Sequence, residues 1–178
     1  MMAVLLLPFM ALAAVGLLLS IGVHIASLLG LQIPGGELVW SLHLGIFVVW
    51  LPAVLVATRA NRGRPHGDYW KTVLSGCPPW MRYAGYALFA YAIANFLWFM
   101  ATNGSQPHPK SDGGASIIRG FSGHWLVFYA AAFAILYSAY RNPRLLRRHR
   151  CPDGHEVSGG DTFCASCGKR IRPPAAED

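Results

Sequence analysis

Hydrophobic and polar positions along this chain separate into four long uncharged runs with short charged segments between them. The runs without Asp, Glu, Lys or Arg cover residues 1–36, 38–58, 83–109 and 120–140. Each reaches the roughly 20 residues that a helix needs to cross the hydrocarbon core of a bilayer. The pattern therefore predicts four transmembrane helices.

Turn residues place the ends of these helices. A Pro-Gly-Gly turn occupies positions 34–36, a Pro-Pro pair at 78–79 suits a helix start, and Asn-Pro at 142–143 ends the last run. Residues 1–140 are then an all-α membrane domain, an up-down four-helix bundle with its second and fourth helices on a diagonal. The predicted helices cover residues 2–30, 38–58, 80–101 and 121–140.

Composition agrees with this fold class. Charged residues make up 13% of the 178 residues, against about 25% in a typical soluble domain. The mean hydropathy is +0.37. A soluble enzyme, a secreted disulfide scaffold and a disordered chain all fit these values poorly.

The basic residues predict an orientation. Of the 15 Lys and Arg residues, only Lys110 and Arg119 lie in the two loops opposite the middle loop and the tail. Because cytoplasmic loops collect Lys and Arg, we expect both termini in the cytoplasm of a cell and the helices in its inner membrane. Topology and anionic headgroups account for the net charge of +7. The expected partner is therefore the lipid bilayer, and no nucleic acid is expected.

The most specific motif lies in the tail. Cys151 and His155 are followed, eight residues later, by Cys164-Ala-Ser-Cys167. Zinc prefers four tetrahedral thiolate or imidazole ligands, which two short-spaced pairs supply. A reducing cytoplasm disfavours a disulfide, and the imidazole favours zinc over rubredoxin-like iron. We predict a structural zinc ion here; iron, a redox thiol pair and a metal-free tail are the alternatives.

Residues 151–170 resemble the short zinc-ribbon modules found at the ends of many bacterial and archaeal proteins. In those modules Cys-Pro-x-Cys-Gly and Phe-Cys-x-x-Cys-Gly form two metal knuckles, and Phe163 and Gly168 match the flanking pattern. His155 departs from it, standing one position later than the expected second cysteine. The resemblance implies a small two-knuckle fold without an activity of its own. By position it implies three ligands: Cys151, Cys164 and Cys167.

The segments on either side of this ribbon differ in character. Residues 141–150 form a juxtamembrane linker with five arginines and no acidic residue, which anionic lipid attracts. Residues 171–178 have nothing to pack and are expected to be disordered. The ribbon is then a small protrusion beneath the membrane, suited to binding a protein partner.

A polar layer crosses the predicted bundle. Each helix carries one strongly polar side chain about 5–9 Å below its outer end. These side chains are His24, His43, Asn95 and His124. Ionisable residues inside a membrane are costly to desolvate and commonly mark a function.

Three interpretations of this layer stay open. His43 and His124 are the predicted axial ligands of a haem b, with His24 and Asn95 supporting them. Alternatively, the three histidines bind one zinc or copper ion or line a proton path. The third possibility is a set of structural hydrogen bonds between helices, with four serines as partners: Ser20, Ser27, Ser41 and Ser122.

Several catalytic signatures are missing from the sequence. No charged residue lies inside a predicted span, and the chain has no phosphate-binding loop, no Gly-x-Ser-x-Gly elbow and no paired acids. We therefore expect a scaffold, an assembly factor or an accessory subunit of a membrane complex rather than a free-standing enzyme. A single-haem electron carrier and a metal or proton pathway protein are the alternative functions.

Overall fold

A computed structural model of the chain describes most of its residues. The predicted disordered tail lies outside the described residues apart from Ile171, as do Arg147 and Arg148 of the linker. The described residues are 4–31, 36–62, 66–103, 115–146, 149–157 and 162–171.

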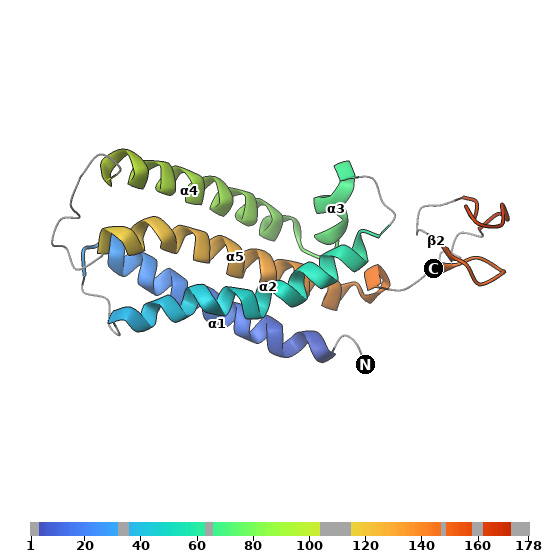
Figure 1. Cartoon of the computed structure of the whole chain (residues 1–178), viewed down its shortest axis with the longest axis horizontal. Coiled ribbons are helices and arrows are strands. Elements are labelled where there is room, and N and C mark those ends of the chain that lie inside the picture. The colour runs from blue at the N-terminus through green and yellow to red at the C-terminus, as the bar shows by residue number, and fades with distance from the viewer. Residues whose placement is uncertain are drawn as a thin grey trace.

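Helices make up nearly all of the described fold (Figure 1). Four of them are long and apolar enough to cross a membrane, which confirms the number predicted from the uncharged runs. The α-helices are α1 (Leu7–Leu28), α2 (Ser41–Ala60), α3 (Tyr69–Val73), α4 (Pro79–Asn103) and α5 (Ala115–Arg141). Four short 3-10 turns accompany them: η1 (Val4–Leu6), η2 (Gly36–Trp40), η3 (His66–Asp68) and η4 (Pro143–Leu146).

The α5 helix begins earlier than the sequence pattern predicts. It starts at Ala115, whereas the uncharged run and its flanking charge place the start at residue 121. Arg119 lies within this first part of α5. One charge near a helix end does not interrupt the backbone hydrogen bonds, because a long basic side chain can reach the polar boundary of the bilayer.

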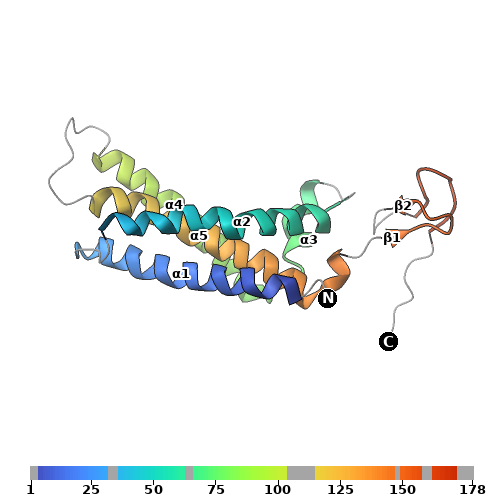
Figure 2. The ribbon, with the colours of Figure 1, turned by 60° about the horizontal axis from the view of Figure 1, so that its bottom comes forward.

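The α5 helix is the centre of the helical domain (Figures 1 and 2). α1, α2 and α4 each pack against α5, and α1 also packs against α2. The expected diagonal between the second and fourth long helices is therefore wrong, because α2 and α5 are in direct contact. α5 has the most buried membrane-length window of the four, and α4 has the least.

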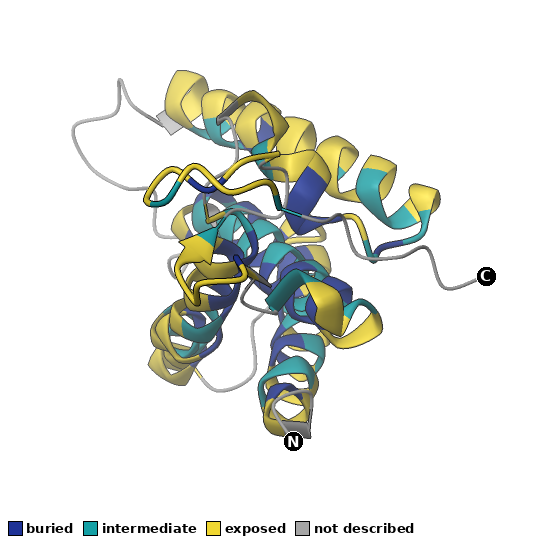
Figure 3. Ribbon diagram, turned by 90° about the vertical axis from the view of Figure 1, so that its right-hand side faces the viewer, coloured by how far each residue is buried: buried dark blue, intermediate teal, exposed yellow. Residues whose placement is uncertain are grey.

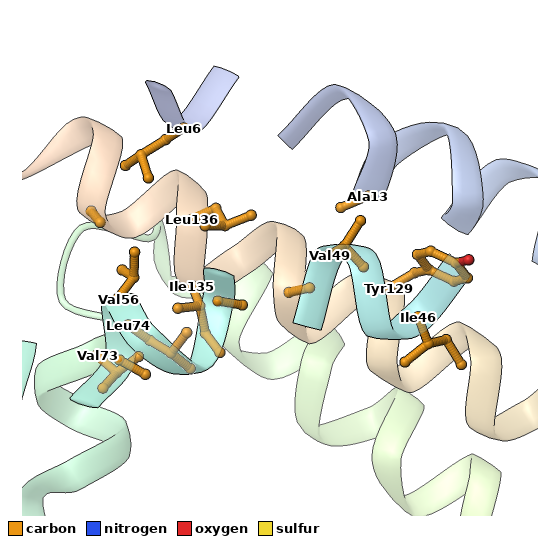
Figure 4. Packing of buried hydrophobic residues seen from close by; sticks show 14 of the residues in the cluster. Leu6, Ala13, Ile46, Val49, Val56, Val73, Leu74, Tyr129, Ile135 and Leu136 are labelled. Atoms are coloured by element: carbon orange, nitrogen blue, oxygen red, sulfur yellow. The ribbon is translucent and has the colours of Figure 1, made fainter. Parts of the chain in front are cut away.

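Close packing between the helices depends on small residues facing large ones. Tyr129 of α5 lies between α1 and α2, near Ala13 and Ile46 (Figure 4). A Cβ atom added to Gly16 or Gly45 would collide with Tyr129. The two glycines therefore provide the space in which this ring crosses the core.

The segment between α2 and α4 packs back onto α5. Val73 of α3 is buried, and the Gly76 amide donates to Ser138 Oγ at 2.9 Å. The buried Cys77 thiol donates to the Ala134 carbonyl at 3.2 Å. These contacts fix α3 against the end of α5 that leads into the tail.

The tail lies beyond the end of the helical domain at which α1 begins and α5 ends (Figures 1 and 2). It contains the antiparallel strands β1 (His149–Arg150) and β2 (Glu156–Val157). Figure 3 looks along the molecule from this end and shows exposed positions on the outward sides of the helices. Among them are many large apolar side chains, including Leu18 of α1, Leu51 of α2 and Leu97 of α4.

Candidate metal centre

The first pair of candidate ligands sits in the turn between β1 and β2. Arg150 faces Glu156 across the strands. The Cys151 amide donates to the His155 carbonyl at 3.0 Å, and the Gly154 amide donates to the Cys151 carbonyl at 2.9 Å. Gly154 has a φ of 84°, in the left-handed region that glycine adopts without steric cost. This turn brings the side chains of Cys151 and His155 close to each other.

The second pair sits in a turn of similar construction. Phe163 and Arg170 form an antiparallel bridge. Inside it, the Cys164 amide donates to the Lys169 carbonyl and the Gly168 amide donates to the Cys164 carbonyl, both at 2.8 Å. Gly168 also has a positive φ, 68°. The described backbone therefore forms two similar turns, which are compatible with a zinc-ribbon segment.

The two turns bring four possible ligand atoms together. One atom from each of Cys151, His155, Cys164 and Cys167 lies within 4.8 Å of all the others. Cys151 Sγ is 3.7 Å from Cys167 Sγ and 3.4 Å from His155 Nδ1. A tetrahedral zinc ion would separate two sulfur ligands by about 3.8 Å, and a sulfur and a nitrogen by about 3.5 Å. The donor set and its spacing fit a zinc ion.

Burial in this part of the tail is confined to the candidate ligands. Cys151 and Cys164 are the buried residues among 150–157 and 162–171, whereas His155 is exposed. The Lys169 ammonium donates to the Asp153 carboxylate and so links the two turns. This hydrogen bond holds the pKa of Asp153 below its usual value. An apolar core is absent from these described residues, so a bound metal would be the main source of their folding energy.

Two of the thiols differ in acidity. Burial opposes ionisation of Cys164, but hydrogen bonds from the backbone at Cys167 and Ser166 outweigh it and lower its pKa to about 7. A backbone hydrogen bond at Lys169 favours the Cys167 thiolate, but burial and the neighbouring thiols prevail and raise its pKa to about 11. Cys164 is therefore the first of the two to supply the thiolate that a metal requires.

His24 connects three helices. Its Nδ1 atom lies 2.6 Å from Ser122 Oγ on α5, and its Nε2 atom lies 2.6 Å from the Tyr91 hydroxyl on α4. The side chain is 4% exposed. The hydrogen-bonding role expected for Ser122 is confirmed, and Ser27 instead donates to the His24 carbonyl at 2.8 Å. Ser20 Oγ is buried without a hydrogen-bond partner among the described residues.

His43 and His124 contact different neighbours. His43 Nδ1 accepts a hydrogen bond from the Trp125 indole at 3.0 Å. His124, the preceding residue of α5, packs edge-on against Phe96 of α4. Because consecutive helix residues point about 100° apart, the two imidazoles lie toward different faces of α5. The haem and metal interpretations of His24, His43 and His124 stay predictions.

Asn95 supports the contact between α4 and α5. Its amide nitrogen donates to the Arg119 carbonyl at 2.9 Å. His124 Nδ1, on the neighbouring turn, is buried and has no hydrogen-bond partner in the described part of the chain. Sequence reasoning missed Tyr91 as a partner of His24. Tyr91 lies four residues before Asn95, hence on the same face of α4, and this spacing was the available signal.

Comparisons with protein-family models, with curated proteins and with solved structures found no match for this chain.

Proposed function

We propose that this chain is a multi-pass protein of a cell inner membrane whose cytoplasmic tail carries a structural zinc ribbon. Through that ribbon it binds a protein partner, as a scaffold, an assembly factor or an accessory subunit of a membrane complex. The observation that carries the proposal is the set of three thiols and one imidazole whose ligand atoms all lie within 4.8 Å of one another.

Exposed apolar side chains support the membrane assignment. Large hydrophobic residues are exposed on α1, α2 and α4, where contact with water would be unfavourable and contact with lipid would not. Basic residues concentrate in the middle loop and the tail. That concentration supports a cytoplasmic location for both termini.

The ligand set supports a structural rather than a hydrolytic role for zinc. Cys151, His155, Cys164 and Cys167 would fill four tetrahedral positions and leave none for water. Zinc bound there would supply rigidity to a tail that has no apolar core. The exposed surface around it includes Phe163, which is 60% exposed and forms a bridge with Arg170. An exposed aromatic beside an arginine is a frequent anchor of protein interfaces.

Elemental analysis tests the metal site. We expect about one zinc per chain in the purified full-length protein, and its loss in the C164S/C167S double variant. Cys77→Ser is the matched control, because Cys77 is a buried thiol of the helical domain that contacts Ala134, and it should retain the zinc. Zinc that survives in the double variant would overturn the assignment.

Crosslinking tests the partner. A photoreactive amino acid in place of Phe163 should capture a specific protein in native membranes, and the capture should disappear in the C164S/C167S background. A matched probe at the exposed Leu18 of α1 should not give the same product. Absence of any product at position 163 would remove the support for a docking role.

Reporter fusions test the topology. Reporters active only in the cytoplasm should work when fused after residue 178 and within residues 63–65. They should be inactive within residues 104–114. A reporter after residue 178 that is active only outside the cytoplasm would contradict the proposed orientation.

A further inference from the structure

The contact between Trp125 and His43 fixes the protonation state of an imidazole. An indole N–H can only donate, so His43 Nδ1, at 3.0 Å from Trp125 Nε1, has to be the acceptor. In a neutral imidazole the proton then lies on Nε2. Trp125 is fully buried, so its N–H has no water to replace His43 as an acceptor.

Protonation of His43 removes this hydrogen bond. An imidazolium carries hydrogen on both ring nitrogens and has no acceptor. Two N–H groups would then point at each other across the contact between α2 and α5. Since a buried donor without an acceptor is unfavourable, the side chains have to separate.

His24 provides the contrast within the same protein. Its two ring nitrogens face the hydroxyls of Ser122 and Tyr91. A hydroxyl either donates or accepts, so both partners can turn their hydrogens away and accept from an imidazolium. Protonation of His24 therefore leaves its two contacts in place, whereas protonation of His43 cannot.

We propose that the hydrogen bond from Trp125 to His43 is a pH-sensitive latch between α2 and α5, closed while His43 is neutral and opened by its protonation. The latch lies at the end of the helical domain opposite the tail, near the start of α2. Opening frees the His43 side chain and loosens the packing of Trp40, whose ring packs on both His43 and Trp125. The hydrogen bond from Tyr129 to the carbonyl of the neighbouring Leu42, at 2.7 Å, still holds the backbone of this first turn of α2.

His43 is the ionisable member of this contact. Its described ring contacts are Trp40, Phe47 and Trp125, and none of them carries a charge. The charged and titratable groups on the elements packed at this end are accounted for elsewhere or lie outside the contact. Glu37 on η2 is exposed, and His24 on α1 is bonded to α4 and α5. The Arg119 charge on α5 acts on His24. His124 packs on Phe96, and Tyr129 is bonded to Leu42.

Nuclear magnetic resonance of the full chain in lipid nanodiscs tests the latch. With ¹⁵N-labelled tryptophan, the Trp125 indole signal should shift along one curve as the pH is lowered and His43 gains its second ring proton. His43→Asn places a non-titrating amide oxygen where Nδ1 was, so its Trp125 signal should not move with pH. His24→Gln is the matched control and should retain the titration. A wild-type signal that stays constant, or an His43→Asn signal that still titrates, would overturn the proposal.

Histidine labelling tests the same inference without a substitution. The His43 Nδ1 resonance should change from its unprotonated to its protonated position over the same pH range as the Trp125 signal. A His43 Nδ1 that remains unprotonated through the Trp125 titration would sink the idea. The zinc content of the same samples reports on the tail independently, so failure of the latch and failure of the proposed function are distinguishable.

Discussion

The Tyr129 hydroxyl of α5 donates a hydrogen bond to the Leu42 carbonyl of α2 across 2.7 Å, and it reaches that carbonyl through space left by two glycines. Gly16 lies against the ring and Gly45 against the hydroxyl. The contact ties three helices together, because Gly16 belongs to α1. Its stability should depend on the absence of a side chain at these two positions.

Substitution of Gly16 by alanine tests this dependence. The new Cβ would overlap the Tyr129 ring, so we expect Gly16→Ala to lower the free energy of unfolding by about 1–3 kcal/mol. Gly22→Ala on the same helix is the control, because a Cβ there meets nothing within 4 Å. It should leave stability unchanged or raise it by up to about 1 kcal/mol. Unfolding midpoints in detergent give both values, and equal losses would contradict the packing described.

The His24 contacts make a second prediction about stability. Tyr91→Phe removes one of the two hydrogen bonds, and His24→Ala removes both. Hydrogen bonds between membrane helices contribute about 0.6 kcal/mol on average and up to about 1.7 kcal/mol. We therefore expect a small loss for Tyr91→Phe and a larger one for His24→Ala. A Tyr91→Phe variant that loses as much as His24→Ala would show that Ser122 contributes nothing.

Thiol reactivity should follow the two cysteine pKa values. In zinc-stripped protein whose two turns remain formed, Cys164, with a pKa lowered to about 7, should be alkylated with a midpoint near that pH; turns that unfold without zinc would instead let both thiols react near the usual pKa of 9.0. Cys167, with a pKa raised to about 11, should react only in strong base. Since the Cys164 pKa is depressed by folding, the stabilisation from its thiolate is present above the usual pKa of 9.0 and is lost as the pH falls through about 7. Mass spectrometry of alkylated peptides at several pH values distinguishes the two sites.

Zinc itself should suppress this reactivity. Both thiols should be protected at every pH at which zinc stays bound, because bound thiolates are not free nucleophiles. Burial raises the pKa of Cys77, so its slow alkylation should be the same with and without zinc. A zinc effect on Cys77 would indicate that the metal acts outside the tail.

The positive φ of Gly168 allows a further test of zinc binding by the tail. Alanine in the left-handed region costs about 1–2 kcal/mol, so Gly168→Ala should weaken zinc binding by roughly five- to thirtyfold. Ala165→Ser, an exposed change in the same turn, should have little effect. Competition with a chromophoric chelator measures both affinities. Equal affinities would mean that the turn adjusts without cost.

Local patterns in the sequence predicted the parts of the fold that local physics decides. Uncharged runs of sufficient length identified the four long helices, because helix length and side-chain polarity together determine whether a segment can cross a bilayer. The spacing of Cys151, His155, Cys164 and Cys167 predicted that these four residues come together as a group that could hold a metal ion, because short turns place such residues side by side.

Contacts between segments distant in the chain could not be predicted from those patterns. The partners of His24 lie 67 and 98 residues away in the chain. The spacing of Tyr91 and Asn95 indicates that they share a face of α4, but it does not indicate which distant residue that face contacts. The diagonal expected for α2 and α5 came from the commonest bundle topology. The actual arrangement depends on which helix faces carry small residues, such as Gly16 and Gly45 facing Tyr129.

The central position of α5 also sets an order of assembly during synthesis. α5 leaves the ribosome after α1, α2 and α4, yet it is the helix on which all three of them pack. α1 and α2 can associate with each other earlier, but α4 has to wait in the bilayer for its main neighbour. A chain truncated before Ala115 should therefore leave α4 unpaired, and that helix would be the first target of quality-control proteases.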